Sequence, residues 1–573
     1  MTDAWLNALR DHDERVGKLD AEIWIGGEPT FSRRDSIEAC WTIAAVGGDK
    51  EERARALILE LAPRLASRFE LGRAPGRSYP GENEPRFAYG MQWAREDSIG
   101  AARQKARRNG GTKPVDAKRL EQERKVPEPE RNVAWMTVTP DPGVVEVNLA
   151  PCPNIENFWH TMRATYAAAE QVGLSPFRYL FHGRVVDSGG GGQLSFGGPT
   201  PEQSPFFVVP WLLPGLVRYL NHHPSLSYWF APECVGSAGQ GPRPDEGVRE
   251  LFSELGVALD VLRAREDQFS KSELMASLGP LLVDCSGNSH RAELNVEKLW
   301  DPDHPRNGLL GVAELRALRM PRTPEHATAV AVLFRAVLAR IAASRFDAPL
   351  REHGAELHDR YALPSVLLED LDAVLRDLHA HNFGLDASIE ALLREPRAVV
   401  GSWDIGAAKL RLVRGMEFWP LLGDVASQEG STARSVDAST SCVEVSVDAG
   451  EVWANGHALP LHPLGKQRVG GVRFRSYVPA RGLHPGLAAS EPLQLEWRVG
   501  KDRVAIAWHA WIPGGGSYDG LPKDAADAEA RREQRLILER RAPSPDPAKA
   551  RDSTVDAATP WVLDLRRLPP APG

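Results

Sequence analysis

The segment that most constrains the fold is residues 138–151, VTPDPGVVEVNLAP. Its Pro-Asp-Pro-Gly turn is followed by a short β-branched run, a pattern that predicts a strand. Because side chains alternate along a strand, Val145, Val147 and Leu149 would share one face, with Glu146 and Asn148 on the other. A carboxylate among valines is costly to bury unless it is paired or holds a cation. Glu146 is therefore either a metal ligand or a polar residue facing water from a half-exposed edge strand.

Two other segments have the same design. Residues 20–31, DAEIWIGGEPTF, place Glu28 after a short apolar run and two glycines, which allow close backbone approach at the end of a strand. Residues 311–316, GVAELR, direct Glu314 and Arg316 to the same side of one strand. That pair is either a structural ion pair or a metal ligand beside a clamp for phosphate or carboxylate. Carboxylates from three separate strands would together suit a Mg–nucleotide site.

These segments are part of a longer pattern, through which the chain resembles the amidoligase family of the glutamine-synthetase-like superfamily. This bacterial family is often found fused behind, or encoded beside, a transglutaminase-like domain. The resemblance covers most of the chain. It is carried by nine segments in order: WIGGEPTF near the start, YPGENEPRFA at 79–88, VTPDPGVVEVNLAP at 138–151, SGGGGQLSFGGPTPEQSPF at 188–206, NHHPSLSYWF at 221–230, GQGPRPDE at 239–246, DCSGNSHRAELNVEKLWDP at 284–302, GLLGVAELRALRMP at 308–321 and VGGVRFRSYVPARGLHPG at 469–486.

The resemblance implies a glutamine-synthetase-like catalytic sheet flanked by helices. It also implies an ATP- and Mg-dependent ligase that joins a carboxylate to an amine through an acyl phosphate, with small-molecule or peptide substrates. Such chemistry needs cations that bridge phosphate oxygens and arginines that stabilise charge on the transferred group. The positions that match the family's pattern are, for the metal, Glu28, Glu146 and Glu314; for catalysis, Arg243, Arg291 and Arg316; and for the nucleotide, Gly190, Gly191, Gln193 and Arg316.

The glycine-rich segment 188–193 has two interpretations. Its glycines alone are typical of a flexible linker. The segment lacks the Lys-Ser/Thr of a P-loop, and it opens no helix as a dinucleotide-binding fingerprint would. Within the family's pattern, its backbone amides would instead cradle a phosphate.

The sequence departs from the family's pattern at the implied site. Gly192-Gln193 stands where the family usually has Asn-His, and Val185 replaces an expected histidine. A glutamine amide oxygen is a weaker ligand than histidine but suits a hard ion such as Mg. Thr30 lies where many members have a second acid. Further along, Arg319-Met320-Pro321-Arg322-Thr323 replaces Glu-Met-Pro-Pro-His.

These departures indicate an alternative function, a catalytically weakened member that acts as a non-enzymatic subunit. Its protein partners would come from a transglutaminase/ATP-grasp gene cluster. Gln193 and Thr323 should discriminate between the two functions. If both side chains fit a closed metal site they favour an enzyme, and if both point into solvent they favour a scaffold.

Composition excludes several classes of protein. The 573 residues carry a net charge of −8, with a pI near 6.1, which argues against general affinity for nucleic acids. No run approaches about 18 apolar residues, so no membrane span is expected, and the acidic amphipathic start is unlike a signal peptide. The scattered cysteines predict a reduced, cytoplasmic location with neither a zinc knuckle nor a disulfide scaffold. They are Cys40, Cys152, Cys234, Cys285 and Cys442.

Changes of pattern along the chain predict three parts. Residues 1–395 alternate strands with long helices and form an α+β unit, interrupted at 97–131 by a charged, solvated insertion. Residues 396–523 contain short alternating runs broken by turn pairs such as Asn455-Gly456, which predict an antiparallel β module. Residues 524–573 would form a charged helix over 524–541 and a Pro-rich tail. Helices of the first part are expected at 50–70, 158–172, 247–265, 323–345 and 365–378.

Overall fold

The structure of the chain is a computed structural model. It describes residues 3–33, 41–43, 71–75, 89–93, 144–236, 239–243, 249–265, 268–284, 287–302, 308–396, 399–421, 436–476, 478, 487, 489–541 and 559–568. The predicted helix at 50–70, the segment at 79–88 and the insertion at 97–131 lie outside the described residues.

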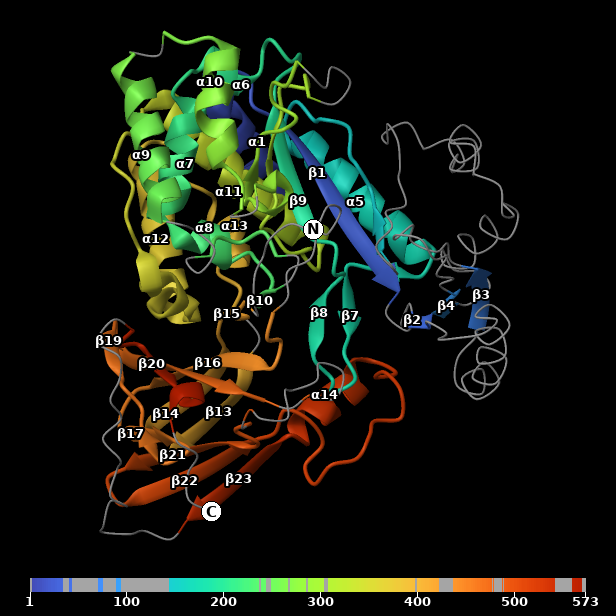
Figure 1. Ribbon diagram of the computed structural model, residues 1–573, viewed down its shortest axis with the longest axis vertical. Coiled ribbons are helices and arrows are strands. Elements are labelled where there is room, and N and C mark those ends of the chain that lie inside the picture. Colours follow the sequence, from blue (N-terminus) through green and yellow to red (C-terminus); the bar gives the residue numbers. More distant parts are fainter. Residues whose placement is uncertain are drawn as a thin grey trace, which may run out of the picture.

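An antiparallel sheet forms the centre of the N-terminal part (Figure 1). Its strand order is β11-β12-β9-β1-β5, and β6 pairs with the end of β1. The strands are β1 (Trp24–Arg33), β5 (Val144–Glu146), β6 (Leu174–Ser175), β9 (Gly192–Gly197), β11 (Leu294–Asn295) and β12 (Ala313–Leu315). Neighbouring strands come from distant parts of the sequence, so each face of the sheet combines side chains that are far apart along the chain.

The central sheet has one apolar and one polar face. Val145, Val147 and Leu149 are buried, whereas Glu146 and Asn148 on the other side are partly exposed, as the alternation predicts. The apolar face continues across β1, β9 and β12. Its further side chains are Ile25, Phe31, Leu194, Phe196, Ala313 and Leu315.

Helices α5 (Ile155–Gln171) and α11 (Pro324–Ala343) cover the apolar face, and α1 (Asp3–Val16) packs against both. Among the described residues, α11 alone is long and apolar enough, by its length and mean hydropathy, to cross a membrane. However, 89% of its most apolar window is buried inside the fold. Such burial is typical of a core helix.

The rest of the N-terminal part is mainly helical. It contains α6 (Pro205–Val208), α7 (Leu212–His222), α8 (Pro224–Tyr228), α9 (Arg249–Ala264), α10 (Lys271–Leu278), α12 (Pro364–Ala380), α13 (Ala387–Leu393) and the short 3-10 helices η1 (Gly279–Leu281), η2 (Ser289–Arg291), η3 (Gly354–His358) and η4 (Arg360–Ala362). Smaller sheets join β2 (Trp41–Ile43), β3 (Leu71–Pro75) and β4 (Tyr89–Trp93), and pair β7 (Phe177–Tyr179) with β8 (Val185–Asp187). The helices expected at 158–172, 247–265, 323–345 and 365–378 are confirmed as α5, α9, α11 and α12, with small shifts of their ends.

Two sheets form the C-terminal β module, and their facing side chains make one core around Trp497. One has the order β13-β14-β16-β20-β19 with β24 beside β20, and the other has the order β18-β17-β21-β22-β23. The strands are β13 (Val399–Ile405), β14 (Ala408–Arg414), β16 (Thr440–Val447), β17 (Glu451–Ala454), β18 (His457–Ala458), β19 (His462–Leu464), β20 (Gln467–Arg475), β21 (Leu493–Val499), β22 (Asp502–Trp508), β23 (Leu536–Arg541) and β24 (Val562–Asp564). The fold is therefore mixed α+β with several antiparallel sheets, which confirms the predicted class.

The end of the chain corrects one prediction. The helix expected over 524–541 stops early, because α14 spans only Ala525–Glu533 and β23 then pairs with β22. The last strand, β24, pairs in parallel with β20 and leads into η5 (Leu565–Arg567). Charged side chains are common on edge strands, where they face water, so their density at 536–541 did not identify a helix.

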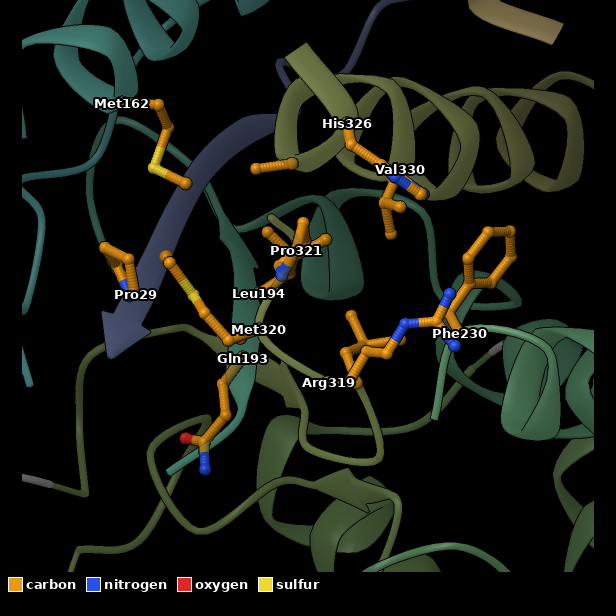
Figure 2. Close-up of a pocket in the computed structure, with 14 residues that line it drawn as sticks. Pro29, Met162, Gln193, Leu194, Phe230, Arg319, Met320, Pro321, His326 and Val330 are labelled. Atoms are coloured by element: carbon orange, nitrogen blue, oxygen red, sulfur yellow. The ribbon is translucent and has the colours of Figure 1, made fainter. Parts of the chain in front are cut away.

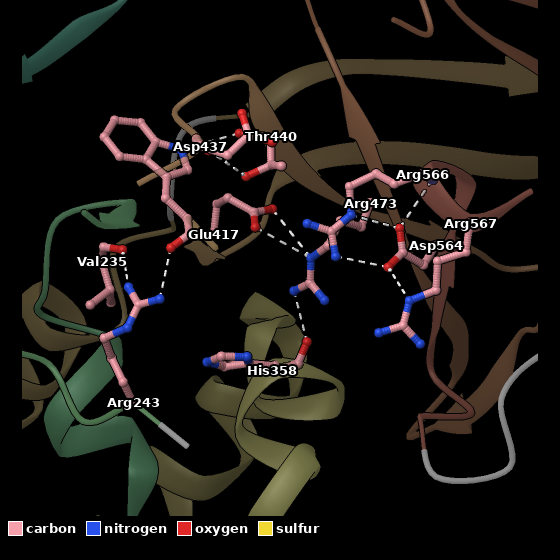
Figure 3. Close-up of polar contacts among 11 residues, drawn as sticks. Val235, Arg243, His358, Glu417, Asp437, Thr440, Arg473, Asp564, Arg566 and Arg567 are labelled. Atoms are coloured by element: carbon pink, nitrogen blue, oxygen red, sulfur yellow. Dashed lines mark hydrogen bonds and ion pairs between the residues drawn. The ribbon is translucent and has the colours of Figure 1, made fainter. Parts of the chain in front are cut away.

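Buried polar contacts join the β module to the helical part (Figure 3). Strand β10 (Cys234–Val235) pairs in parallel with β15 (Glu417–Phe418). Beside them, Arg473 forms an ion pair with Glu417 at 3.4 Å and donates a hydrogen bond to the carbonyl of His358 at 2.7 Å. Breaking a buried pair of this kind is strongly destabilising. These contacts at the junction therefore contribute to the stability of the fold.

A candidate active site on the polar face of the sheet

Cross-strand pairing gathers polar residues on the polar face of the central sheet. Glu28 lies opposite Gln193, and Glu314 lies between Ser195 and Asn295. Directly opposed residues of an antiparallel pair project from the same face. The pairing of Thr30 with Glu146 extends that face to β5. Its polar members are Glu28, Thr30, Glu146, Asn148, Gln193, Ser195, Asn295, Glu314 and Arg316.

At the centre of this face, Glu28 and Glu314 share two hydrogen-bonding partners. Gln193, with its amide nitrogen turned toward the carboxylates, donates to Oε2 of Glu28 at 2.7 Å and to Oε1 of Glu314. Nζ of Lys298 lies 3.2 Å from Oε1 of Glu28 and 3.3 Å from Oε2 of Glu314. Glu314 is only 1% exposed. The two acids therefore meet in a largely dry site, where they share one ammonium.

The electrostatics of this cluster follow from burial and like charge. Burial and, to a smaller extent, the neighbouring Glu314 raise the pKa of Glu28 to about 7 against the opposing effect of Lys298. Burial also raises the pKa of Glu146, and Glu314 adds to that shift. Burial disfavours the charged form of Lys298, but Glu314 and Glu28 outweigh it and raise the pKa of the ammonium. The cluster therefore holds more negative charge than one ammonium neutralises, which favours an added cation.

The structure brings the three predicted acids onto one face without making them equivalent. Glu146 accepts a hydrogen bond from Nδ2 of Asn148 at 3.0 Å and is close enough to raise the pKa of Glu28, while Glu314 raises the pKa of Glu146. Within the described residues, however, no three His, Cys, Asp or Glu side chains form a group that could hold one metal ion. The expectation of one ion shared by Glu28, Glu146 and Glu314 therefore needs correction: Glu28 and Glu314 converge, and Glu146 lies beside them.

Sequence reasoning missed Lys298. The residue follows β11 in a polar stretch, where a lone lysine is normally solvated. Its contacts with two acids from other strands have no local signal in the sequence. By contrast, the Glu314/Arg316 pair was visible from alternation: Nη1 of Arg316 lies 3.7 Å from Oε2 of Glu314.

The glycine-rich segment packs closely against the edge of the sheet. Oγ1 of Thr30 lies 2.6 Å from Oγ of Ser188 and also donates to the carbonyl of Gly191. The amide of Gly192 donates to the carbonyl of Leu318 at 2.9 Å. A Cβ on Gly192 would come within 2.7 Å of the carbonyl oxygen of Arg319, so only glycine fits here. The segment is therefore held in place by backbone contacts with its neighbours.

Two predicted arginines line a different cavity. This cavity has a volume of about 260 Å³, and among the residues that line it are Arg243, Arg291 and Glu293 but not Glu28, Gln193 or Glu314. Arg291 forms a buried ion pair with Asp284 at 3.1 Å. Arg243 donates 2.7 Å hydrogen bonds to the carbonyls of Val235 and Trp419, at the junction with the β module (Figure 3).

With the geometry described, the chain can be compared with known proteins. A family model described as "Putative amidoligase enzyme (DUF2126)" matches residues 4–125 and 117–566. The chain belongs to this family. No curated protein matches it in sequence. A solved structure titled "Crystal structure of novel glutamine synthase homolog" shares 15% identity, covering 68% of this chain and 70% of that chain, with a TM-score of 0.26. A TM-score this low carries no argument about fold or function.

The residues that depart from the amidoligase family's pattern lie in different environments in the structure. Gln193 faces Glu28 and Glu314, and Figure 2 shows its side chain pointing away from Met162 and Val330. Thr323 is exposed and caps α11, where it accepts a 3.2 Å hydrogen bond from the amide of His326. Arg319 donates to the carbonyls of Trp229 and Ala231 at 3.1 and 3.2 Å. The two discriminating residues therefore point to opposite conclusions, since Gln193 fits the site and Thr323 does not.

A buried glutamate in the wall of the 260 Å³ cavity should make the stability of this amidoligase family member depend on pH. Glu293 lines it and accepts a hydrogen bond from Ser227, and burial raises its pKa from 4.5 to about 7. The stabilising contribution of the retained proton is complete below pH 4.5 and is lost as the pH rises to about 7. The unfolding free energy of the parent should therefore fall by up to about 3 kcal/mol over this pH range, and we expect Glu293→Gln to abolish this fall. Urea unfolding between about pH 5 and 8 measures it, with the exposed Glu22→Gln as control. Identical pH profiles for Glu293→Gln and the parent would contradict the assignment.

Proposed function

We propose that this protein is an ATP- and Mg-dependent ligase that joins a carboxylate to an amine through an acyl phosphate. The observation that carries the proposal is the convergence of Glu28 and Glu314 on Gln193 and Lys298, on one face of a sheet built from four distant segments. Membership of the amidoligase family supports it. On this proposal the sheet is the counterpart of a glutamine-synthetase-like catalytic sheet.

The donor set fits a hard divalent cation. Glu28 and Glu314 offer carboxylate oxygens, which the ammonium of Lys298 contacts at 3.2 and 3.3 Å. A half-turn of the Gln193 amide would present its oxygen as a third ligand of the type that Mg prefers. When bound, Mg would neutralise phosphate oxygens and assist transfer of the γ-phosphoryl group to the substrate carboxylate.

The remaining residues of the face have separate tasks in this proposal. Arg316, directed to the same side as Glu314, would orient a phosphate through its planar guanidinium. Glu146 would accept the proton that the attacking amine releases as phosphate leaves the acyl carbon. Its raised pKa brings it closer to neutral pH, which suits a general base. Burial of Glu314 and Gln193 keeps the centre of the site dry, which limits hydrolysis of an acyl phosphate.

One observation favours the second candidate function, a non-enzymatic subunit with protein partners. The ammonium of Lys298 already contacts both carboxylates that would bind the cation. If this internal ion pair has replaced the metal ion, the protein would still fold but would not catalyse ligation. This candidate predicts that the protein binds Mg no better than an unrelated acidic surface does.

Calorimetric titration of nucleotide, with and without Mg, tests the proposed function. We expect a non-hydrolysable ATP analogue to bind only with Mg, and saturation at about 100 times the dissociation constant to add about 2.7 kcal/mol to stability.

Arg316→Lys should weaken nucleotide binding, since it removes bidentate contacts. Arg243→Lys should lower stability instead, because Arg243 holds backbone carbonyls. The exposed Arg263→Lys is the control, and absence of any Mg-dependent binding would leave the non-enzymatic function.

A further inference from the structure

Three arginines from distant segments line a small cavity between the helical part and the β module. Arg184 precedes β8, Arg414 ends β14, and Arg535 precedes β23. Their side chains are 9%, 13% and 3% exposed, respectively. The wall of the cavity also includes the hydroxyl-bearing Ser441 and Ser476.

Positive charge exceeds negative charge at this cavity. Among the described residues, Glu233 is the carboxylate that contacts the arginines: it forms an ion pair with Arg184 and lies 3.9 Å from Nε of Arg414. Arg535 donates to the carbonyls of His509 and Ala510 at 3.4 and 3.2 Å. Other charged or titratable groups that act on the three arginines are Glu491, Cys234, Tyr518 and Arg532.

Some hydrogen-bond donors of the three arginines also lack acceptors in the described part of the chain. Nε of Arg184 and Nε of Arg535 are buried without an acceptor in the described part of the chain. Arg414 stacks 4.9 Å from the centre of the Trp508 ring, and its one described polar contact is the distant one to Glu233. Burial, together with Arg184, holds the pKa of Arg414 well below its usual range. Three guanidinium groups thus converge on a space in which they repel one another.

A buried charge is stable only when it is paired and hydrogen-bonded, so this arrangement calls for an anion. We infer that the cavity binds a small oxyanion, and that a phosphate group matches its donors best. Planar guanidinium groups recognise phosphate through paired hydrogen bonds. The hydroxyls of Ser441 and Ser476 lie on the same wall with their oxygens 3.2 Å apart, and Ser476 donates to the carbonyl of Ser439 at 3.4 Å.

The size of the cavity limits the ligand. Its volume is about 20 Å³, which accommodates one water-sized group. One oxygen of a phosphate group therefore enters, and the rest of the anion, with any molecule that carries it, lies outside. Because the arginines come from both parts of the chain, a bound anion would connect the helical part with the β module. This site is separate from Glu28 and Glu314, and its test needs neither Mg nor nucleotide.

Thermal unfolding of the full chain in sodium phosphate, against sodium chloride and sodium acetate at equal ionic strength, tests the inference. We expect millimolar phosphate to raise the melting temperature of the parent by about 2 °C or more beyond either control salt. Arg414→Gln should lose this shift, and Arg263→Gln, which removes an exposed arginine of α9, should keep it. An equal shift with chloride would overturn the phosphate assignment, as would a phosphate shift that Arg414→Gln retains.

A second variant keeps the test valid if Arg414→Gln folds poorly. Ser441→Asp places a carboxylate among the three arginines and should replace the missing anion. We expect it to raise the melting temperature in phosphate-free buffer and to abolish the response to phosphate. A lower melting temperature with the phosphate response intact would show that the cavity needs no anion.

Discussion

Glu314→Gln is expected to lower the affinity of the protein for Mg by about 100-fold or more. Loss of a group that merely supports a metal ligand already reduces affinity by about 10- to 100-fold, and here a ligand's own charge is removed. Glu314 is 1% exposed and lies within reach of Gln193, Lys298 and Arg316, at the centre of the proposed site. Calorimetric titration of Mg measures the change directly.

Two matched variants make that result specific. Glu22→Gln removes an exposed carboxylate close to β1 and should leave Mg affinity unchanged. Gln193→His should preserve or strengthen divalent-ion binding, because a neutral imidazole is a competent ligand. If Glu314→Gln and the parent bind Mg equally, the cation site is not on this face of the sheet.

Lys298→Met is expected to destabilise the Mg-free protein by about 2–3 kcal/mol. Removing one partner of a fully buried ion pair costs about 3–5 kcal/mol, and the 38% exposure of the Lys298 side chain reduces that figure. Glu28 and Glu314 would be left facing each other without a counter-charge. Urea unfolding in the presence of a chelator measures the loss, and Lys298→Arg should recover part of it.

Addition of Mg to Lys298→Met separates the two proposed functions. If the cation occupies the same carboxylates as the ammonium, Mg should restore most of the lost stability, and the variant should bind Mg more tightly than the parent. If the site has become an internal ion pair only, Mg should restore nothing. Equal stability of variant and parent in chelator would show that Lys298 does not neutralise these acids.

Local patterns in the sequence predicted several of the elements. The alternation around Glu146 and around Glu314 predicted which residues lie on the polar face, because the side-chain period of a strand is fixed by its backbone. Helices α5, α9 and α12 followed from apolar spacing, since each buries one stripe of its own surface, whereas α11 is buried all round from Ala327 to Ala342. The order of the nine segments identified the family, and the family match confirms it.

The tertiary structure decided which of those residues meet. Lys298 joins Glu28 and Glu314 only because β11, β12, β9 and β1 are neighbours in the sheet, and strand order is a non-local property. The same is true of Arg243, which contacts the junction with the β module, and of residues 536–541, whose pairing with β22 outweighs their resemblance to a charged helix. The sequence by itself determined which side chains this protein offers to a site. Long-range pairing decided how they are combined, because each contact joins groups whose positions no local pattern specifies.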